Sequence, residues 1–406
     1  GKTKNLVGQP IFKQIVKMLP REQFDLLVQQ CGSDRYYKTF FSWDQLIVML
    51  FGIFSRCDSM GEVCDSMRAL EGKLNYLNMD CSPAKSTAGD ALRDRSEELF
   101  KLYYFALIAY FRPLLSVSRK KDVSFEEFYA FDSSTFTLFS EVMKGVGRNR
   151  KDDGKKKGGL KVHMLTDIHA DTAVFATISE AKMHDKKFLA HLNPAKGSML
   201  VFDKAYNFYQ QFADWTREGV NFVCRLKDNA KAQLQEVLFE KNLTKEEFGV
   251  YKIGHIHLEY KREKKPETLC LRLVYYKDEK GRKYKFITNN WEITPEEVAL
   301  IYKYRWTIEL TFKKLKQNVQ LHFFYSETEN GIKTQIWCTL IAHLLLNVVR
   351  VLSESKKAFS TIAALIRIHL ISHLNLTWVV TEGRRAYTKR TKSRNKSPAN
   401  VQMSLF

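Results

Sequence analysis

Apolar residues recur every three or four positions along the first 118 residues of the chain. The segments 41–55 and 96–111 carry this spacing most clearly, and no strand-like alternation lies between them. The pattern therefore predicts a helical N-terminal region. Ser82-Pro83 and Ser86-Thr87 stand between these segments and are residues that commonly begin helices. Short helices joined by tight turns are typical of a helix-turn-helix module, but they fit an ordinary helical packing domain equally well.

The pattern changes near residue 123, where runs rich in aromatic and β-branched residues begin. These runs predict strands at residues 125–139, 160–168, 172–181, 198–206 and 221–229. Two helices are expected among them, at residues 184–197 and 207–219. This order of elements resembles an α/β sheet that begins with a meander of three strands.

Further strands are predicted between residues 230 and 292, and helices resume after them. The strands are expected at 250–260, 268–277 and 284–290, with a hairpin turn at 278–281. Thr294 is a candidate N-cap and Pro295 a first-turn proline for the next helix. Residues 294–352 are predicted to be helical except around 322–332, and 359–373 forms one more helix.

One predicted helix carries an unusual row of polar residues along the border of its apolar face. Tyr302, Arg305, Glu309 and Lys316 fall into a sector of roughly 60° if each residue turns the helix by about 100°. Most often such a row is a solvated face, and an ion pair between Glu309 and Lys313, four residues apart, would be its ordinary explanation. The rest of the chain has to decide between these interpretations.

Charge narrows the class of partner. The chain of 406 residues has 65 Lys and Arg against 45 Asp and Glu, a net charge of +20. This excess favours a polyanionic partner, because Lys and Arg displace the counterions that condense on phosphates. The Gly/Lys-rich loop 145–161 and the tail 383–398 are expected to be basic arms that meet a phosphate backbone, or else solvated segments. In the helical region Lys85, Arg93 and Arg95 are candidate phosphate contacts.

Cysteine usage and hydropathy indicate the compartment. The seven cysteines include no C-x-x-C pair, which predicts reduced and mostly buried thiols. The N-terminal residues show no signal peptide, and the apolar segment 335–352 contains His343, Asn347 and Arg350. This segment is expected to be a buried helix, not a membrane span. The protein is therefore expected to be cytoplasmic, with no membrane partner.

Three acidic residues stand in positions where they could meet. Asp132 follows one apolar strand, Asp203 ends another, and Glu309 lies on the helix with the polar row. An aspartate at a strand end usually caps a turn or a helix. Taken together, however, two aspartates from one sheet and a glutamate from a packed helix could converge, and only a cation would then offset their repulsion.

Hard carboxylate ligands of this number suit Mg²⁺ or Mn²⁺. Two such ions, roughly 4 Å apart, activate an attacking hydroxyl and stabilise the leaving oxygen in a displacement at phosphorus. Arg305, Lys316 and Lys313 would then flank Glu309 as cations for substrate phosphates. Tyr302 would donate a hydrogen bond to a phosphate oxygen, and Trp306 offers a flat surface for an unstacked base.

These residues carry a resemblance to a known family. The spacing Y-x₂-R-x₃-E-x₆-K, matched without a gap by Tyr302, Arg305, Glu309 and Lys316, resembles the signature of the insertion sequence 4 family of bacterial DDE transposases. Trp306 directly after the arginine is also frequent there. The segments FDSSTFTL around Asp132 and LVFDKAY around Asp203 resemble the two aspartate strands of that family. The resemblance covers roughly residues 125–350.

The resemblance implies an α/β fold: an RNase H-like mixed sheet flanked by helices, with a β-rich insertion and an N-terminal all-helical domain. Its segments are expected to be a DNA-binding domain at 1–118, the first part of the catalytic core at 119–229, the insertion at 230–292, the C-terminal helices of the core at 293–375 and a basic tail at 376–406.

By the same resemblance, Asp132, Asp203 and Glu309 are the ligands of two Mg²⁺ or Mn²⁺ ions and the catalytic residues. Tyr302, Arg305, Trp306, Lys313 and Lys316 would contact DNA. Members of the family bind the terminal inverted repeats of their element as homodimers, cleave them and join them to target DNA, some through hairpin ends. The expected setting is the bacterial cytoplasm, at the nucleoid.

Two departures from the family pattern bear on the later steps. Lys204-Ala205-Tyr206 follows Asp203 where many members have Arg-Gly-Tyr or Arg-Ala-Tyr. Trp291 is the candidate for a base-flipping tryptophan in the insertion, although a core tryptophan after a strand is the more ordinary interpretation. Two other functions stay open: a DNA-binding protein derived from a transposase that has lost catalysis, and an RNase H-like nuclease of resolution or repair.

Overall fold

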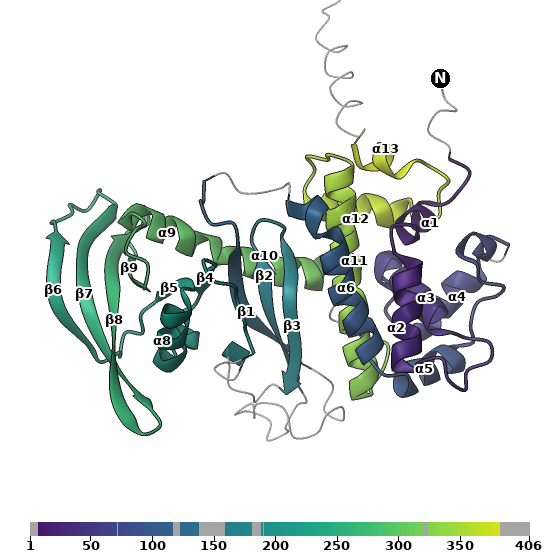
Figure 1. Cartoon of the computed structure of the whole chain (residues 1–406). Helices are drawn as coiled ribbons and strands as arrows, with labels where there is room; N and C mark the ends of the chain where they lie inside the picture. Colours follow the sequence, from purple (N-terminus) through teal and green to yellow (C-terminus); the bar gives the residue numbers. More distant parts are fainter. Residues whose placement is uncertain are drawn as a thin grey trace, which may run out of the picture. The chain divides into compact units, whose positions relative to one another are not determined.

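The computed structural model of the chain forms two compact units (Figure 1). It describes residues 7–70, 72–116, 122–137, 159–180, 188–189, 191–319 and 324–381. One unit comprises residues 1–107, 318–325 and 335–406, and the other comprises residues 108–317 and 326–334. The predicted basic loop lies almost entirely outside the described residues, as does the predicted tail from residue 382 onwards.

The first unit is helical throughout its described part, which confirms the helices predicted in the N-terminal region. Its helices are α1 (Ile11–Val16), α2 (Arg21–Cys31), α3 (Ser42–Ser55), α4 (Met60–Arg68), η2 (Leu74–Leu77), α5 (Lys85–Asp94), the first part of α6 (Glu98–Leu115), most of α11 (Glu329–Leu352), α12 (Phe359–Ile368) and α13 (Leu376–Thr381). The first six residues of the predicted basic tail are therefore a helix, because Leu376, Val379 and Val380 are buried.

The C-terminal helices pack with the N-terminal ones, whereas the segment boundaries expected from the sequence assign residues 293–375 to the catalytic core. The indole Nε1 of Trp337 on α11 donates a hydrogen bond of 2.7 Å to Glu97, and the Trp337 ring lies 5.9 Å from that of Tyr104. Every residue from 335 to 349 is buried. A helix that is apolar all round carries no sequence signal of which neighbour it packs against.

The apolar segment is buried inside the protein. Among the described residues, α11 is the single helix long and apolar enough to cross a membrane, and 83% of its most apolar window is buried. Such burial is typical of a core helix. All seven cysteines are free thiols, and Cys57, Cys64, Cys224 and Cys338 are buried, as predicted.

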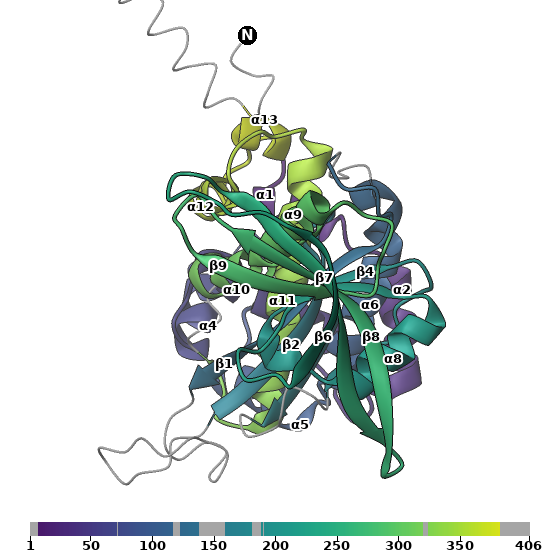
Figure 2. The same cartoon turned by 90° about the vertical axis from the view of Figure 1, so that its left-hand side faces the viewer.

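The second unit is built on a single sheet of nine strands, in the order β3-β2-β1-β4-β5-β9-β8-β7-β6 (Figures 1 and 2). The strands are β1 (Phe128–Thr137), β2 (Gly159–Asp167), β3 (Thr172–Glu180), β4 (Met199–Phe202), β5 (Asn221–Arg225), β6 (Ala232–Glu240), β7 (Gly249–Arg262), β8 (Lys265–Lys277) and β9 (Lys283–Thr288). β1 pairs parallel with β4 and β4 parallel with β5, whereas all other pairs are antiparallel. The first five strands, in the order β3-β2-β1-β4-β5, form the mixed sheet that the resemblance implies.

The β-rich insertion continues this sheet. β9 pairs with β5 through Val223 and Thr288, so the insertion strands extend the core sheet at its β5 edge. β6 was not predicted, although it forms the far edge of the sheet. Its sequence does not alternate regularly, because two bulges, after Leu234 and after Val237, interrupt its pairing with β7. All its residues except Ala232 are exposed.

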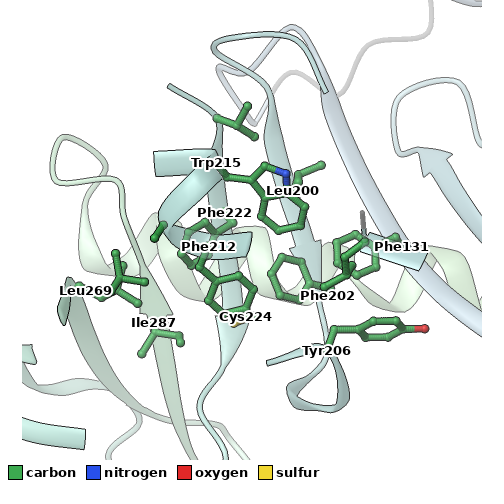
Figure 3. Close-up of a cluster of buried hydrophobic side chains, with 14 of the residues drawn as sticks. Phe131, Leu200, Phe202, Tyr206, Phe212, Trp215, Phe222, Cys224, Leu269 and Ile287 are labelled. Atoms are coloured by element: carbon green, nitrogen blue, oxygen red, sulfur yellow. The ribbon is translucent and has the colours of Figure 1, made fainter. Parts of the chain in front are cut away.

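Aromatic packing supports the two strands that carry the aspartates (Figure 3). Phe131 on β1 and Phe202 on β4 stack with their ring centroids 4.4 Å apart. Trp215, on helix α8 (Tyr209–Glu218), packs against Phe202 at 5.9 Å. Successive side chains of a strand point to opposite faces. The phenylalanines therefore enter the core, and Asp132 and Asp203, one residue later on each chain segment, point away from it.

The predicted polar helix is two helices, α9 (Pro295–Tyr304) and α10 (Trp306–Asn318). The break falls at Arg305, whose N–H donates to the Tyr302 carbonyl at 3.1 Å, while Ile308 N–H donates to the Arg305 carbonyl at 3.3 Å. These tighter i→i+3 bonds replace the α-helical pattern for one turn. The start of α9 is as predicted: Thr294 and Glu297 form a capping box, and Pro295 occupies the first turn.

Candidate active site

The sheet places Asp132 and Asp203 side by side. β1 and β4 are parallel neighbours with Ala130 opposite Val201. Extending this register by two residues brings Asp132 opposite Asp203, on strands that lie about 5 Å apart. Asp203 directly follows β4 and precedes the short helix η4 (Lys204–Tyr206). Convergence of the two aspartates, expected from their positions after apolar strands, is therefore a property of the sheet register.

Asp132 is held in a largely buried position. Its Oδ1 accepts hydrogen bonds from the Ser133 backbone N–H at 2.8 Å and from the Tyr206 hydroxyl at 3.3 Å. Burial raises the pKa of this carboxyl to about 6, although the two hydrogen bonds and the Arg305 charge act to lower the pKa. The nearby Glu309 carboxylate adds to the rise. Asp132 thus sits where a further cation would stabilise its charged form.

Arg305, at the junction of α9 and α10, connects two of the three acids. Its Nη1 lies 2.6 Å from Glu309 Oε1 and 3.9 Å from Asp132 Oδ2. Burial alone would lower the pKa of the guanidinium, but Tyr302, Glu309 and Asp203 outweigh burial and raise its pKa. The Arg305–Glu309 pair also replaces the ordinary surface pair between Glu309 and Lys313 that the helical spacing allowed.

Tyr302 connects the third acid to the same helices. Its hydroxyl donates a hydrogen bond of 3.2 Å to Asp203 Oδ1, and its ring packs 4.6 Å from that of Phe286 on β9. Burial and the charge of Asp203 raise the pKa of the phenol, so it stays protonated and able to donate. Asp132, Asp203 and Glu309 therefore lie around Arg305 and Tyr302.

The carboxylates suit a metal in chemistry, but in this structure they are bridged by an arginine. Three acids that each offer hard oxygen donors are the set that Mg²⁺ and Mn²⁺ prefer. Among the described residues, however, no group of three or more His, Cys, Asp and Glu side chains gathers closely enough to hold a metal ion. The Arg305 guanidinium stands among them as the local positive charge. The two-ion site at Asp132, Asp203 and Glu309 stays a prediction.

The other predicted DNA contacts on α10 differ in setting. Lys316 is half-buried: its Nζ donates to Ser134 Oγ at 2.8 Å, lies 4.7 Å from the Phe136 ring, and has its pKa lowered by burial. Lys316 therefore lies beside β1 at Ser134, the second residue after Asp132. Lys313 is exposed.

Trp306 lines an open cavity beside the carboxylates. The cavity has a volume of about 360 Å³ and lies between the β8–β9 hairpin and α9. The Trp306 side chain is 55% exposed. Trp291 is also exposed, with its ring edge-on to His255 at 4.7 Å, so the alternative of a core tryptophan at this position is wrong.

Two of the three candidate DNA contacts in the helical unit already bind other groups of the protein. Arg93 on α5 pairs with Asp90 at 2.9 Å and with Asp94 at 2.8 Å, both on the same helix. Lys85 is exposed at the start of α5. Arg95 is buried and donates to Gln45 and to two backbone carbonyls, so it holds the fold of this unit and is not a surface phosphate contact.

Two polar residues near Asp203 received no role from the sequence. Tyr206 donates to Asp132, and Lys204 pairs with Asp228 at 2.8 Å. Their signal was present in the segment Lys204-Ala205-Tyr206, which follows the second aspartate. Only the short helix η4 shows that Tyr206 turns back toward β1.

Comparison with known proteins identifies the family. The family described as "Transposase DDE domain" matches residues 123–345. The chain belongs to the transposase DDE domain family. A second family, described only as a domain of unknown function (DUF4372), matches residues 7–79 in the helical unit.

Two curated relatives carry transposase names. A Geobacillus stearothermophilus protein, "Probable transposase for insertion sequence element IS5377", is 25% identical over 218 residues, covering 53% of this chain and 54% of that protein. The "Transposase for insertion sequence element IS231D" of Bacillus thuringiensis subsp. finitimus is 22% identical over 338 residues, covering 67% of this chain and 68% of that protein.

This DDE-domain chain spans about half the length of the first curated relatives it matches, 55% and 54%. Among solved structures, a piggyBac transposase synaptic complex with hairpin DNA matches with a TM-score of 0.44 at 10% identity, covering 98% of this chain and 87% of that one.

Proposed function

We propose that this chain is a metal-dependent DNA transposase that binds the inverted repeats at the ends of an insertion sequence, cleaves them and joins them to target DNA. The observation that carries the proposal is the placement of Asp132 on β1 and of Asp203 directly after β4, its parallel neighbour, with Glu309 tied to Asp132 through Arg305. Membership of the transposase DDE domain family supports it.

In this proposal Asp132, Asp203 and Glu309 hold two Mg²⁺ or Mn²⁺ ions, which supply activation of the attacking hydroxyl and stabilisation of the leaving oxygen. Tyr302 orients Asp203 through its hydrogen bond, and Tyr206 orients Asp132. Both tyrosines keep the carboxylate oxygens in fixed positions on the open side of the sheet. Lys316 and Lys313 contact phosphates, and Trp306 contacts a distorted base.

Arg305 has a double role in the proposal. In the free protein it offsets the repulsion between Asp132 and Glu309. A guanidinium is also a strong bidentate partner for phosphate. We infer that a DNA phosphate draws Arg305 away from the acids, so that they become available to metal ions when the substrate is in place.

Strand cleavage tests the proposed function. Purified protein is incubated with Mg²⁺ or Mn²⁺ and labelled DNA carrying the ends of its own element, and nicked and joined products are measured. Wild type should cleave and join, and Asp132→Asn should bind the ends but lose cleavage by about 10³-fold or more, since metal assistance supplies several kcal/mol. Asp25→Asn, which removes an exposed carboxylate from α2, should cleave normally.

Metal binding tests the role of Arg305 separately. Without DNA, Arg305→Gln should bind Mn²⁺ about tenfold more tightly than wild type, because it removes a competing positive charge from the acids. Titration followed by the paramagnetic signal of free Mn²⁺ measures this. Equal Mn²⁺ affinity in the two proteins would show that Arg305 does not compete for the site.

One observation favours a second function, that of a DNA-binding regulatory protein without catalysis. The Arg305 guanidinium pairs with Glu309, where a metal ion would otherwise bind. Among the described residues, no three His, Cys, Asp or Glu side chains lie close enough together to hold a metal ion. Equal end binding by wild type and by a protein lacking all three acids, with no cleavage by either, would establish this alternative. A preference for junctions or RNA–DNA hybrids would instead indicate a repair nuclease.

We also propose that the transposase acts as a homodimer on two paired DNA ends, in the cytoplasm at the nucleoid. A mixture of Asp132→Asn subunits with wild-type subunits tests the dimer. A mixed dimer has one working active site for two ends, so it should process only one of them.

A further inference from the structure

A row of lysine and tyrosine side chains crosses three strands of the β-rich insertion. Lys252 on β7 is paired in register with Tyr275 on β8, and Tyr275 with Lys285 on β9. Directly opposite residues of neighbouring strands point to the same face of a sheet. The three side chains therefore form a continuous line, about 10 Å long, across two strand spacings.

The members of this lysine–tyrosine row contact one another. Lys252 Nζ and Lys285 Nζ lie 6.0 and 5.8 Å from the centre of the Tyr275 ring. The Tyr251 ring lies 5.7 Å from that of Tyr275, and Lys283 Nζ lies 5.7 Å from the Tyr251 ring. Both tyrosines are half-buried, so their rings are held at the surface in fixed places.

The positive charge of the row is only partly neutralised. Lys252 pairs with Glu240 on β6 at 3.0 Å. Lys283 and Lys285 are exposed and form no ion pair within the part of the chain that the structure describes. Stabilising the sheet would need the aromatic rings but not three lysines around them, because like charges placed together repel.

The row lies on the opposite face of the sheet from the candidate active site. Tyr275 packs against the core that contains Phe202, whereas Phe286, the residue after Lys285, faces Tyr302. The two faces meet at the ends of β4 and β5.

The backbone carbonyl of Lys285 accepts a hydrogen bond of 2.9 Å from Leu226, the residue after β5. The next residues, 227–229, line an open hollow of about 530 Å³ together with Asp203 and Lys204. Lys204 and, more weakly, Lys285 lower the pKa of Asp228 in this hollow. Lys204, beside Asp203, and Lys285, in the row, thus both act on Asp228, so the hollow joins the two faces at the ends of the strands.

We propose that the lysine–tyrosine row, Lys252, Tyr275 and Lys285 with Lys283 and Tyr251, binds an unpaired DNA strand that leaves the active site through the hollow beside Asp203. Lysines at strand spacing follow a phosphate backbone, and aromatic rings held at the surface between them stack on bases. Stacking requires base faces that a duplex keeps covered. The inference rests on the proposed function in taking DNA as the partner, and it adds where a single strand is held.

Fluorescence anisotropy with a labelled single strand of about 16 nucleotides, of mixed sequence, tests the proposal on the full chain. Tyr275→Leu should weaken single-strand binding about tenfold, because a base–aromatic stack is lost, whereas Tyr275→Phe keeps the ring and should bind like wild type. Lys285→Gln should lower the slope of log K against log salt by about 0.7.

The matched control is Lys265→Gln, which removes an exposed lysine from the far end of the same β8 strand. It should change single-strand affinity and the salt slope much less than Lys285→Gln. Thermal unfolding of each variant checks that the sheet is intact. Equal effects of Lys265→Gln and Lys285→Gln, or a loss with Tyr275→Leu only for duplex DNA, would overturn the proposal.

Cleavage of element ends by the same preparations separates this inference from the proposed function. Asp132→Asn should lose cleavage and keep single-strand binding, because the row does not involve the carboxylates. If the protein cleaves element ends but the row variants bind single strands as wild type does, the proposed function stands and the proposed role of the row is wrong. A protein that binds through the row but cleaves nothing refutes the proposed function alone.

Discussion

The two halves of the nine-stranded sheet bury their side chains in opposite ways. In the core half, all four residues of β4 are buried, and so are the three central residues of β5. In the insertion half, β7 and β8 alternate between buried and less buried residues, and β6 is exposed almost throughout. One continuous sheet thus passes from a core covered on both faces to an open edge.

This difference separates two ways of placing functional groups. In the core half, Asp132 and Asp203 are fixed by buried strands and by the stacked rings of Phe131 and Phe202 beneath them. A reacting centre benefits from this rigidity, because small displacements cost rate. In the insertion half, Lys283 and Lys285 extend into solvent from a half-covered face, which suits contact with a flexible partner.

Removal of one large side chain from each half should give the largest contrast in stability. Phe202→Ala deletes a fully buried ring under the active site and should lower the free energy of unfolding by about 3–5 kcal/mol. Phe239→Ala on β6, where the ring is 43% exposed, should cost about 0.5 kcal/mol or less. Urea unfolding measures both. Similar losses for the two variants would contradict the contrast between the halves.

The pH dependence of stability should reveal burial at Asp132, with no counterpart in the open half. Folding raises the pKa of Asp132 from 3.8 to about 6, so the folded chain binds a proton more tightly than the unfolded chain does. The free energy of unfolding should therefore fall as pH rises from about 4 to about 6, by up to about 3 kcal/mol from this group, and then level off.

Urea unfolding in the presence of a chelator, across this pH range, checks the expectation for Asp132. The Asp132→Asn variant lacks the titrating group and should show a correspondingly flatter dependence. If the two proteins lost stability in parallel as pH rises, Asp132 would not be the buried carboxyl that the structure shows.

A smaller loss of stability is expected from a change at the start of α9, the helix that packs at the boundary between the halves. Thr294→Ala removes the N-cap oxygen that accepts from Glu297 N–H and should cost about 1 kcal/mol. Thr294→Ser keeps the oxygen and should be close to wild type. Thermal unfolding compares the two variants, and an equal loss in both would mean that the methyl group, not the cap, is responsible.

The sequence predicted the core half better than the insertion half, for physical reasons. Buried strands such as β4 (Met199–Phe202) are continuous apolar runs, and an aspartate that follows such a run is conspicuous. The edge strand β6 has no such run, because it faces solvent and its bulges break the period of two. Pattern alone could not distinguish it from a loop.

Within the candidate site, the sequence predicted which residues take part, but not which cation pairs with Glu309. The spacing of Arg305, Glu309 and Lys313 allows Glu309 to pair with either cation, and burial near Asp132 decides for Arg305. No glycine or proline stands near Arg305 from which the break of the helix could be predicted. Both outcomes depend on tertiary contacts that bring the helix to the sheet.

The bulged edge of β6 has a consequence for the solubility of the chain. Leu234, Val237 and Phe239 are each more than 40% exposed on a strand whose outer side pairs with no other strand of the described residues. A straight strand of this composition would template the addition of further strands from other molecules. The bulges disrupt that template, and Gly254 makes them possible, since a Cβ there would lie 2.6 Å from the Glu236 carbonyl oxygen. An alanine at this position would therefore force the backbone at Glu236 to shift.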